Sequence, residues 1–236
     1  MGLKFNREKQ RNFLASFFYK IDKIVPLSSK SKLKLYLDLE WIMWHLAHDY
    51  IYKSNSQNAD TETKNNFLIE KIKEDSDILD LGCGRGYVAK TLLEKTSKIL
   101  GVDYNRASIE HAKKSLSGTG AEFICEDIFD YLSENPERRF DIIVLSHILE
   151  HIDAPEDFLN KLVGKADSFY IEVPDIQATH LNVYRKMVGT DLTYNDADHV
   201  SEFDREELEA IIRNANLKIM DSEFKWGVMK FWCEKI

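Results

Sequence analysis

The stretch that decides the fold is DILDLGCGRG, residues 77–86. Its apolar first half is typical of a buried strand, and it ends in Gly82, Gly84 and Gly86 just before a helical pattern over 87–96. Glycine adopts backbone angles closed to other residues and lets a ligand approach the main chain closely. The spacing is G-x-G-x-G, and residue 87 is Tyr where the dinucleotide fingerprint has its last Gly. We therefore expect a ligand-binding strand–turn–helix unit for which a nicotinamide dinucleotide is a weak candidate.

Short apolar runs alternate with helical patterns along the rest of the chain, and this predicts parallel strands joined by right-handed crossovers. The last two runs, separated by a short polar break, predict an antiparallel pair at the edge of the sheet. Strands are predicted at 77–82, 98–103, 121–127, from 140 to about His147, 168–174, 217–224 and 227–234, and helices at 87–96, 106–116, 128–135, 154–166 and 204–216. The sequence shows no internal repeat.

Residues 1–72 differ from this pattern. Within 36–52, apolar and aromatic residues recur at spacings of three and four, which predicts a helix with an aromatic stripe, although the alternation in KLKLYLDLE (32–40) would also suit a strand. The stripe consists of Leu37, Trp41, Trp44, His45, His48 and Tyr52. We expect 1–72 to form an N-terminal helical cap over the carboxyl edge of the sheet, where ligands bind in open α/β folds. A dimer interface is the alternative for this segment.

Composition and charge restrict the class of protein. The 236 residues carry a net charge of −8, and no apolar run approaches the roughly 20 residues that span a bilayer. Residues 1–55 hold ten Lys/Arg against five Asp/Glu and the remainder 22 against 35, so an acidic body makes nucleic acid an unlikely partner. The three cysteines are odd in number and far apart, and the first ten residues are too polar for a secretory signal. We expect a cytoplasmic protein without a membrane anchor, as a monomer or homodimer.

Acidic residues stand at the ends of the first three predicted strands. Asp103 follows Gly82 by 21 residues, where a carboxylate can accept hydrogen bonds from ribose hydroxyls. Asp127 ends the third strand, placed to meet an adenine amino group while Ile128 packs on the ring. Asp80 precedes the glycines and can hold either the turn or an amino group of the ligand. These positions predict a nucleoside-containing ligand.

Together these features resemble the class I S-adenosylmethionine-dependent methyltransferases. The resemblance covers roughly residues 65–235 and rests on five segments in the family's order: DILDLGCGRG, GVDYN, CEDIFD, FDIIVLSHILEH and HVSEFDREELEAIIRNANL. It implies a three-layer α/β sandwich over 73–236 with a seven-stranded, mostly parallel sheet of order 3-2-1-4-5-7-6 and strand seven antiparallel. It also implies that the cofactor, S-adenosylmethionine, contacts the following residues: Asp80, Gly82, Cys83, Gly84, Gly86, Asp103, Tyr104, Asp127, Ile128 and Ser146.

Two histidines and a carboxylate follow the fourth predicted strand. His147, Glu150 and His151 are spaced i, i+3 and i+4, so they share one face if the segment is helical. H-x-x-E-H is also an inverzincin signature, but that motif lies within a long helix, whereas this one closes a core strand. A protease is therefore rejected.

The same residues are similar to the E-x-x-E-H of small-RNA 2′-O-methyltransferases and some ubiquinone-pathway O-methyltransferases, with His147 in place of the first Glu. That resemblance implies a divalent metal held by His147, Glu150, His151 and His199, which would suit Mg, Mn, Fe or Zn. The metal would lower the pKa of a substrate hydroxyl. Without a metal, His147 or His151 is the candidate general base. Many methyltransferases end this strand in LEH with no metal, where the residues only order the turn.

A long insertion, 175–198, separates the fifth strand from the next helix and is expected to complete the substrate pocket with the N-terminal cap. Tyr184, Arg185 and Tyr194 are the candidate contacts. The resemblance implies methyl transfer to a hydroxyl of a small molecule or sugar. A nitrogen acceptor, terminal 2′-O-methylation of RNA, and a non-catalytic binding module with the same fold remain as alternatives.

Overall fold

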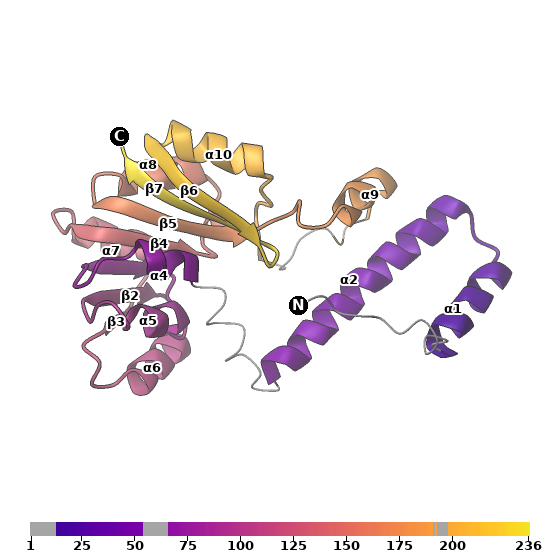
Figure 1. The fold of residues 1–236 in the computed structure, drawn as a ribbon, viewed down its shortest axis with the longest axis horizontal. Helices are drawn as coiled ribbons and strands as arrows, with labels where there is room; N and C mark the ends of the chain where they lie inside the picture. The colour runs from indigo at the N-terminus through magenta and orange to yellow at the C-terminus, as the bar shows by residue number, and fades with distance from the viewer. Residues whose placement is uncertain (1–12, 54–65, 191, 193–197) are drawn as a thin grey trace.

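The computed structural model describes residues 13–53, 66–190, 192 and 198–236. They form one seven-stranded sheet of order β3-β2-β1-β4-β5-β7-β6 with helices on both faces, as predicted (Figure 1). β7 is antiparallel to both of its neighbours, and the other pairs are parallel. The strands are β1 (Ile78–Leu81), β2 (Ile99–Asp103), β3 (Glu122–Cys125), β4 (Phe140–Ser146), β5 (Ala166–Pro174), β6 (Leu217–Lys225) and β7 (Val228–Lys235).

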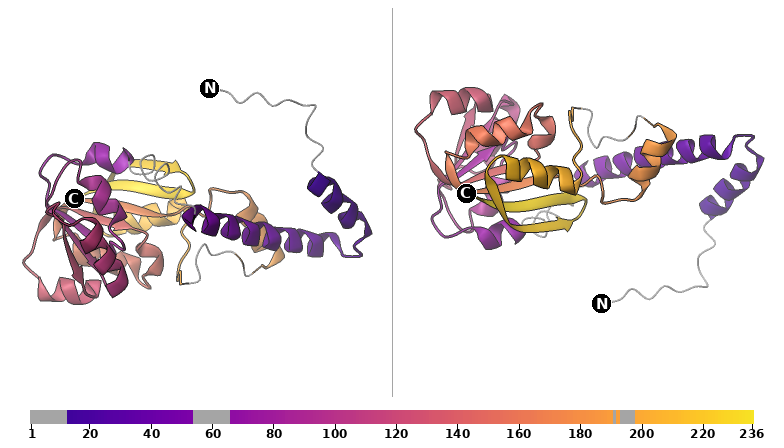
Figure 2. Two further views of the ribbon diagram at one scale, coloured as in Figure 1. Left: turned by 90° about the horizontal axis from the view of Figure 1, so that it is seen from below. Right: turned by 90° about the horizontal axis from the view of Figure 1, so that it is seen from above.

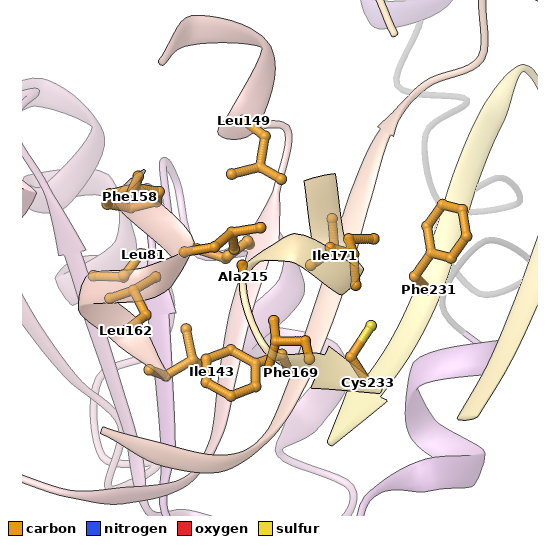
Figure 3. Close-up of a cluster of buried hydrophobic side chains, with 14 of the residues drawn as sticks. Leu81, Ile143, Leu149, Phe158, Leu162, Phe169, Ile171, Ala215, Phe231 and Cys233 are labelled. Carbon is orange, nitrogen blue, oxygen red and sulfur yellow. The ribbon is translucent and has the colours of Figure 1, made fainter. Parts of the chain in front are cut away.

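Two hydrophobic clusters cover the two faces of the sheet. Every residue of β1 is buried, as expected for a central parallel strand with both faces covered. On one face pack α4 (Asn66–Lys71), α5 (Tyr87–Leu92) and α6 (Arg106–Ser115). On the other pack α7 (Ile128–Glu134), α8 (Pro155–Leu162) and α10 (Arg205–Asn214), and Phe158, Leu162, Ile143 and Phe169 belong to one cluster on this face (Figure 3).

Two helices end well before the predicted residue, and the one predicted over 87–96 ends at Leu92. The helix predicted over 154–166 ends at Leu162, because Lys165 turns back onto the Leu162 carbonyl and Ala166 already pairs with Phe140 in the sheet. After β4 only Leu149–His151 form a single 3₁₀ turn, η2, so the segment does not continue as an α-helix. His147 precedes that turn with a φ of 58°.

Residues 13–53 of the N-terminal segment form two helices. α1 (Phe13–Ile24) and α2 (Ser29–Lys53) include the whole of 32–40, for which a strand was the alternative. α2 packs on α9 (Leu181–Val188) of the insertion. Both helices lie beyond the carboxyl ends of the parallel strands, on the side to which the β5 arrow points (Figures 1 and 2). None of the helices in the described ranges is long and apolar enough to cross a membrane.

Candidate functional site

The glycine turn links β1 to α5 and leaves an open space at its centre. Gly82, Gly84 and Gly86 have φ values of 71°, 51° and 77°, a region that L side chains rarely adopt. A Cβ on Gly82 would lie 1.9 Å from Ile148 Cδ1, whereas one on Gly84 would meet nothing within 4 Å. A Cβ on Gly86 would press on Leu116 and its neighbours at 3.1–3.3 Å. Gly84 therefore faces open space, and Gly86 packs closely against its neighbours.

Asp103 fixes this turn from the end of β2. Its Oδ2 accepts from the Gly84 N–H at 2.8 Å and its Oδ1 from the Asn105 N–H at 2.7 Å. Each carboxylate oxygen retains a second lone pair for a ligand hydroxyl. The predicted ribose-binding residue thus also orders the backbone that the ligand would meet.

Asp80 is a buried carboxyl group with an unsatisfied oxygen. Its side chain is 1% exposed, and Oδ2 has no hydrogen-bond partner among the described residues. Burial, together with the nearby charge of Asp103, raises its pKa from 3.8 to about 7. Leaving a buried polar atom unpaired costs about 1–3 kcal/mol, so such atoms mark positions that a ligand completes. The turn and Asp80 therefore fit a nucleoside ligand that carries an amino group.

The remaining residues predicted to contact the cofactor differ in the exposure and bonding of their side chains. Cys83 packs its side chain into the core beside Gly101, so only its backbone faces the turn. Asp127 caps α7, with Oδ1 accepting from the Phe129 N–H at 2.8 Å and the Asp130 N–H at 3.4 Å. Tyr104 is 77% exposed. Ile128, the first residue of α7, and Ser146, the last residue of β4, are half-buried.

His147 is held between two carboxylates. Its Nδ1 lies 3.1 Å from Glu150 Oε1 and its Nε2 lies 3.2 Å from Glu172 Oε1. Burial would lower the pKa of His147, but the hydrogen bonds to Glu150 and Glu172 raise it, to about 10. An imidazolium that donates both N–H groups has no lone pair for a metal or a substrate proton. In this arrangement both ring nitrogens of His147 face carboxylates, and its role as a metal ligand or base stays a prediction.

Glu172 was not anticipated from the sequence. It lies in β5 and is buried, its second oxygen accepts from the Tyr170 hydroxyl, and the bond from His147 lowers its pKa against the opposing effect of burial. A carboxylate inside the apolar run SFYIEVP was the available signal.

Glu150, His151 and His199 come together as a group able to hold a metal ion. One potential ligand atom from each lies within 4.8 Å of the others. Glu150 is 1% exposed, and its Oε2 has no hydrogen-bond partner in the part of the chain that the structure describes. The Val200 and Ser201 N–H groups bond the Glu150 carbonyl at 2.9 and 3.1 Å, which fixes the distant His199 segment beside η2.

Both histidines of this group are anchored through Nδ1. His151 Nδ1 lies 3.2 Å from the Asp198 carbonyl, and His199 Nδ1 lies 2.9 Å from Glu202 Oε1. A carbonyl only accepts, so His151 must donate from Nδ1, and its neutral ring then presents an unprotonated Nε2. Such anchoring by a carbonyl or carboxylate is usual for metal-binding histidines. Three of the four predicted ligands thus fit a divalent cation, and His147 lies outside the set.

The insertion supplies structural contacts as well as exposed ones. Arg185 is buried and donates to Glu40 of α2, to Asn182 Oδ1 at 2.7 Å and to the Leu37 carbonyl at 3.4 Å, so it joins α9 to α2. Tyr184 is 44% exposed. Tyr194 lies outside the described residues.

Comparison with known proteins agrees with this geometry. A family model described as "Methyltransferase domain" matches residues 53–222. The chain belongs to this methyltransferase family. The methyltransferase is 25% identical, over 68% of its length and 57% of the relative's, to the mitochondrial ubiquinone biosynthesis O-methyltransferase of Schizosaccharomyces pombe. It is 26% identical to the malonyl-[acyl-carrier protein] O-methyltransferase of Priestia megaterium, over 78% of this chain and 68% of that one. The chain spans little more than half the length of the first of these relatives.

Solved structures show the same fold. The methyltransferase superimposes on a SAM-dependent methyltransferase from Archaeoglobus fulgidus with a TM-score of 0.59 at 17% identity, over 80% of this chain and 99% of that one. It superimposes on the magnesium protoporphyrin IX methyltransferase of Synechocystis with bound SAH with a TM-score of 0.55 at 12% identity, over 95% of each chain. At these identities the likeness establishes the fold alone.

Proposed function

We propose that the protein transfers a methyl group from S-adenosylmethionine to a hydroxyl oxygen of a small molecule or sugar. The glycine turn, Asp103 and the unsatisfied Asp80 would hold the cofactor, which supplies a methyl group activated on a sulfonium. The observation that supports an oxygen acceptor is the group of Glu150, His151 and His199. Glu150 and His151 of this group come two and three residues after Ile148, whose side chain lies close to Gly82 of the turn. The acceptor-side chemistry is thus next to the donor site.

A hydroxyl is a poor nucleophile until its proton is removed, and this group offers two ways to remove it. His151 Nε2, unprotonated while Nδ1 donates to the Asp198 carbonyl, can accept the proton as a general base. Alternatively Glu150, His151 and His199 would hold a divalent cation, which would lower the pKa of the hydroxyl so that its proton passes to water. The buried, unsatisfied Glu150 Oε2 favours the cation, because an ion would satisfy that oxygen. Two nitrogens and one carboxylate suit Mn, Fe or Zn better than Mg.

The walls of the acceptor pocket would come from the insertion and α2. Tyr184 is exposed beside Arg185, which joins the two helices beyond the carboxyl ends of the strands (Figure 1). The N-terminal segment would then cap the site, as the sequence predicts. The acidic balance of the chain favours a small acceptor over a long nucleic acid.

Calorimetric titration of metal-stripped protein with Mn²⁺ tests the acceptor assignment. We expect one site in the wild type, loss of its binding heat in His151→Ala, and no change in His111→Ala, an exposed histidine of α6. Removal of the metal should reduce methylation of a hydroxyl acceptor. Unchanged activity after chelation, with a nitrogen acceptor as substrate, would contradict the proposal and favour N-methylation.

A further inference from the structure

Helices α1 and α2 expose far more apolar surface than an isolated chain normally does. Large apolar side chains on them are between 38% and 78% exposed, and they include Phe17, Phe18, Ile24, Leu39, Met43 and Leu46. Since each such side chain offers roughly 150–250 Å², the exposed total is on the order of 1,000 Å². The largest apolar patch of a monomer is typically about 300–600 Å².

The exposed residues of α2 have the spacing of a helix–helix seam. Leu35, Leu39, Ile42 and Leu46 follow one another at intervals of four, three and four, and all four are exposed. Alternating intervals of three and four are the pattern that buries one helix against another. A 3–4 stripe on a helix surface therefore indicates a helical partner for this side.

Within its own chain α2 already uses the opposite side. Leu37 is buried there, and its carbonyl accepts from Arg185 of α9. At about 100° per residue, Leu37 lies roughly opposite the middle of the exposed stripe. α9 therefore does not cover the stripe, and among the described residues this second apolar side of α2 stays exposed.

α1 is attached to α2 only near their junction. Asp22 of α1 accepts from the Tyr36 hydroxyl at 2.7 Å and pairs with Lys32 at 3.2 Å. Beyond that point the two helices diverge in all three views (Figures 1 and 2). Two such open helical hairpins can complete each other as a four-helix bundle. The exposed apolar area matches the roughly 800 Å² per partner of a standard interface.

A lipid surface fits these helices less well. Interfacial helices carry Lys and Arg on the polar face, whereas Lys34 here pairs with Asp38 on the same helix at 2.9 Å. Residues 13–53 carry six Lys against four Asp/Glu, so their charge is mixed and lacks the strongly basic face of an interfacial helix.

We propose that the α1–α2 hairpin is a dimerisation arm, whose Leu35–Leu39–Ile42–Leu46 stripe packs against the same stripe of a second copy of this chain. The interface is isologous, so a two-fold axis closes the assembly as a dimer. The side of α2 that carries Leu37 remains packed on α9, so the dimer would also stabilise the position of the insertion.

Sedimentation velocity of the full chain at micromolar concentrations tests the arm. The wild type should sediment with twice the 27.5 kDa mass of one chain. Ile42→Glu/Leu46→Glu changes two exposed positions in a helix that tolerates Glu, so it should fold as a monomer that binds S-adenosylhomocysteine with wild-type affinity. Met220→Glu, at an exposed position of β6, is the matched control and should remain a dimer.

Two results would overturn the proposal. The first is a wild type that is monomeric at every concentration measured. If that monomer also binds vesicles of phosphatidylcholine and phosphatidylglycerol, the stripe is assigned to a lipid surface. The second is a double variant that stays dimeric while it binds S-adenosylhomocysteine normally, which would place the interface elsewhere.

Discussion

At the scale of single residues, Asp80 combines a structural cost with a binding role. Its pKa is raised from 3.8 to about 7, first by burial and then by Asp103. The folded protein therefore holds this proton more tightly than the unfolded chain, and Asp80 lowers the free energy of unfolding progressively as the pH rises from about 4 to about 7. A ligand ammonium group would relieve that cost.

Asp80→Asn should therefore separate stability from binding. Because Asn carries no buried charge, we expect a higher Tm than the wild type at about pH 8, with the gain shrinking at about pH 5, where Asp80 is protonated. S-adenosylhomocysteine should bind roughly 10–100-fold more weakly, the value of a charge-assisted hydrogen bond. Thermal scans at both pH values and calorimetry measure the two effects, with the exposed Glu110→Gln as a control. A variant that is less stable at both pH values but binds normally would make Asp80 a structural residue of the turn.

The glycines offer a matched pair of substitutions. Gly82→Ala brings a methyl group onto Ile148, and we expect a loss of about 1–3 kcal/mol in the free energy of unfolding beyond backbone strain. Gly84→Ala meets no atom, so only the strain of its positive φ, about 1–2 kcal/mol, should remain. Its methyl group would nevertheless enter the ligand space and weaken S-adenosylhomocysteine binding at least tenfold. Denaturant titration and calorimetry on both variants test this, and equal binding by Gly84→Ala and wild type would contradict it.

At the scale of elements, the periodic part of the chain was predictable. Apolar runs alternate with helical patterns from β1 onward, and short right-handed connections allow only a few topologies. The resemblance to class I methyltransferases then specified the strand order. The ends of elements were less predictable. The end of α8 depends on the pairing of Ala166 with Phe140, a contact between residues far apart in the sequence.

The candidate site shows the same limit. The spacing of His147, Glu150 and His151 predicted a shared face, but His147 has a positive φ and its ring lies between Glu150 and Glu172, outside the group formed with His199. Glu172 lies on a neighbouring strand, so no local pattern reports the contact. His199 was predicted through the resemblance, and backbone bonds from its segment to Glu150 bring it to the site.

Substitution of Arg185 tests whether this side chain holds α2 against α9. Because its buried side chain bonds Glu40 and the Leu37 carbonyl, Arg185→Ala should leave these groups unpaired and loosen α2. We expect amide hydrogen exchange in α2 to accelerate roughly 10–100-fold, with β1 and β4 unaffected. Lys186→Ala, an exposed neighbour, is the control. Unchanged exchange in α2 would mean that Arg185 does not hold the two helices together.

At the scale of the whole molecule, the candidate site and the helical arm lie at the same edge of the sheet. The sheet carries the cofactor turn and the Glu150–His151–His199 group at its carboxyl edge, and the helical arm extends beyond that edge (Figure 2). α2 contributes to both, because one side packs on the insertion and the other carries the exposed stripe. Substitutions in the stripe should therefore change assembly without changing cofactor affinity.

The most direct test of the central claim is calorimetric titration of the metal-stripped protein with S-adenosylhomocysteine. We expect binding at one site per chain with micromolar affinity. The affinity should be weaker in both Gly84→Ala and Asp80→Asn and unchanged in Glu110→Gln. Absence of binding to a folded wild type, or equal binding by all three variants, would contradict a methyl-donor site at the glycine turn.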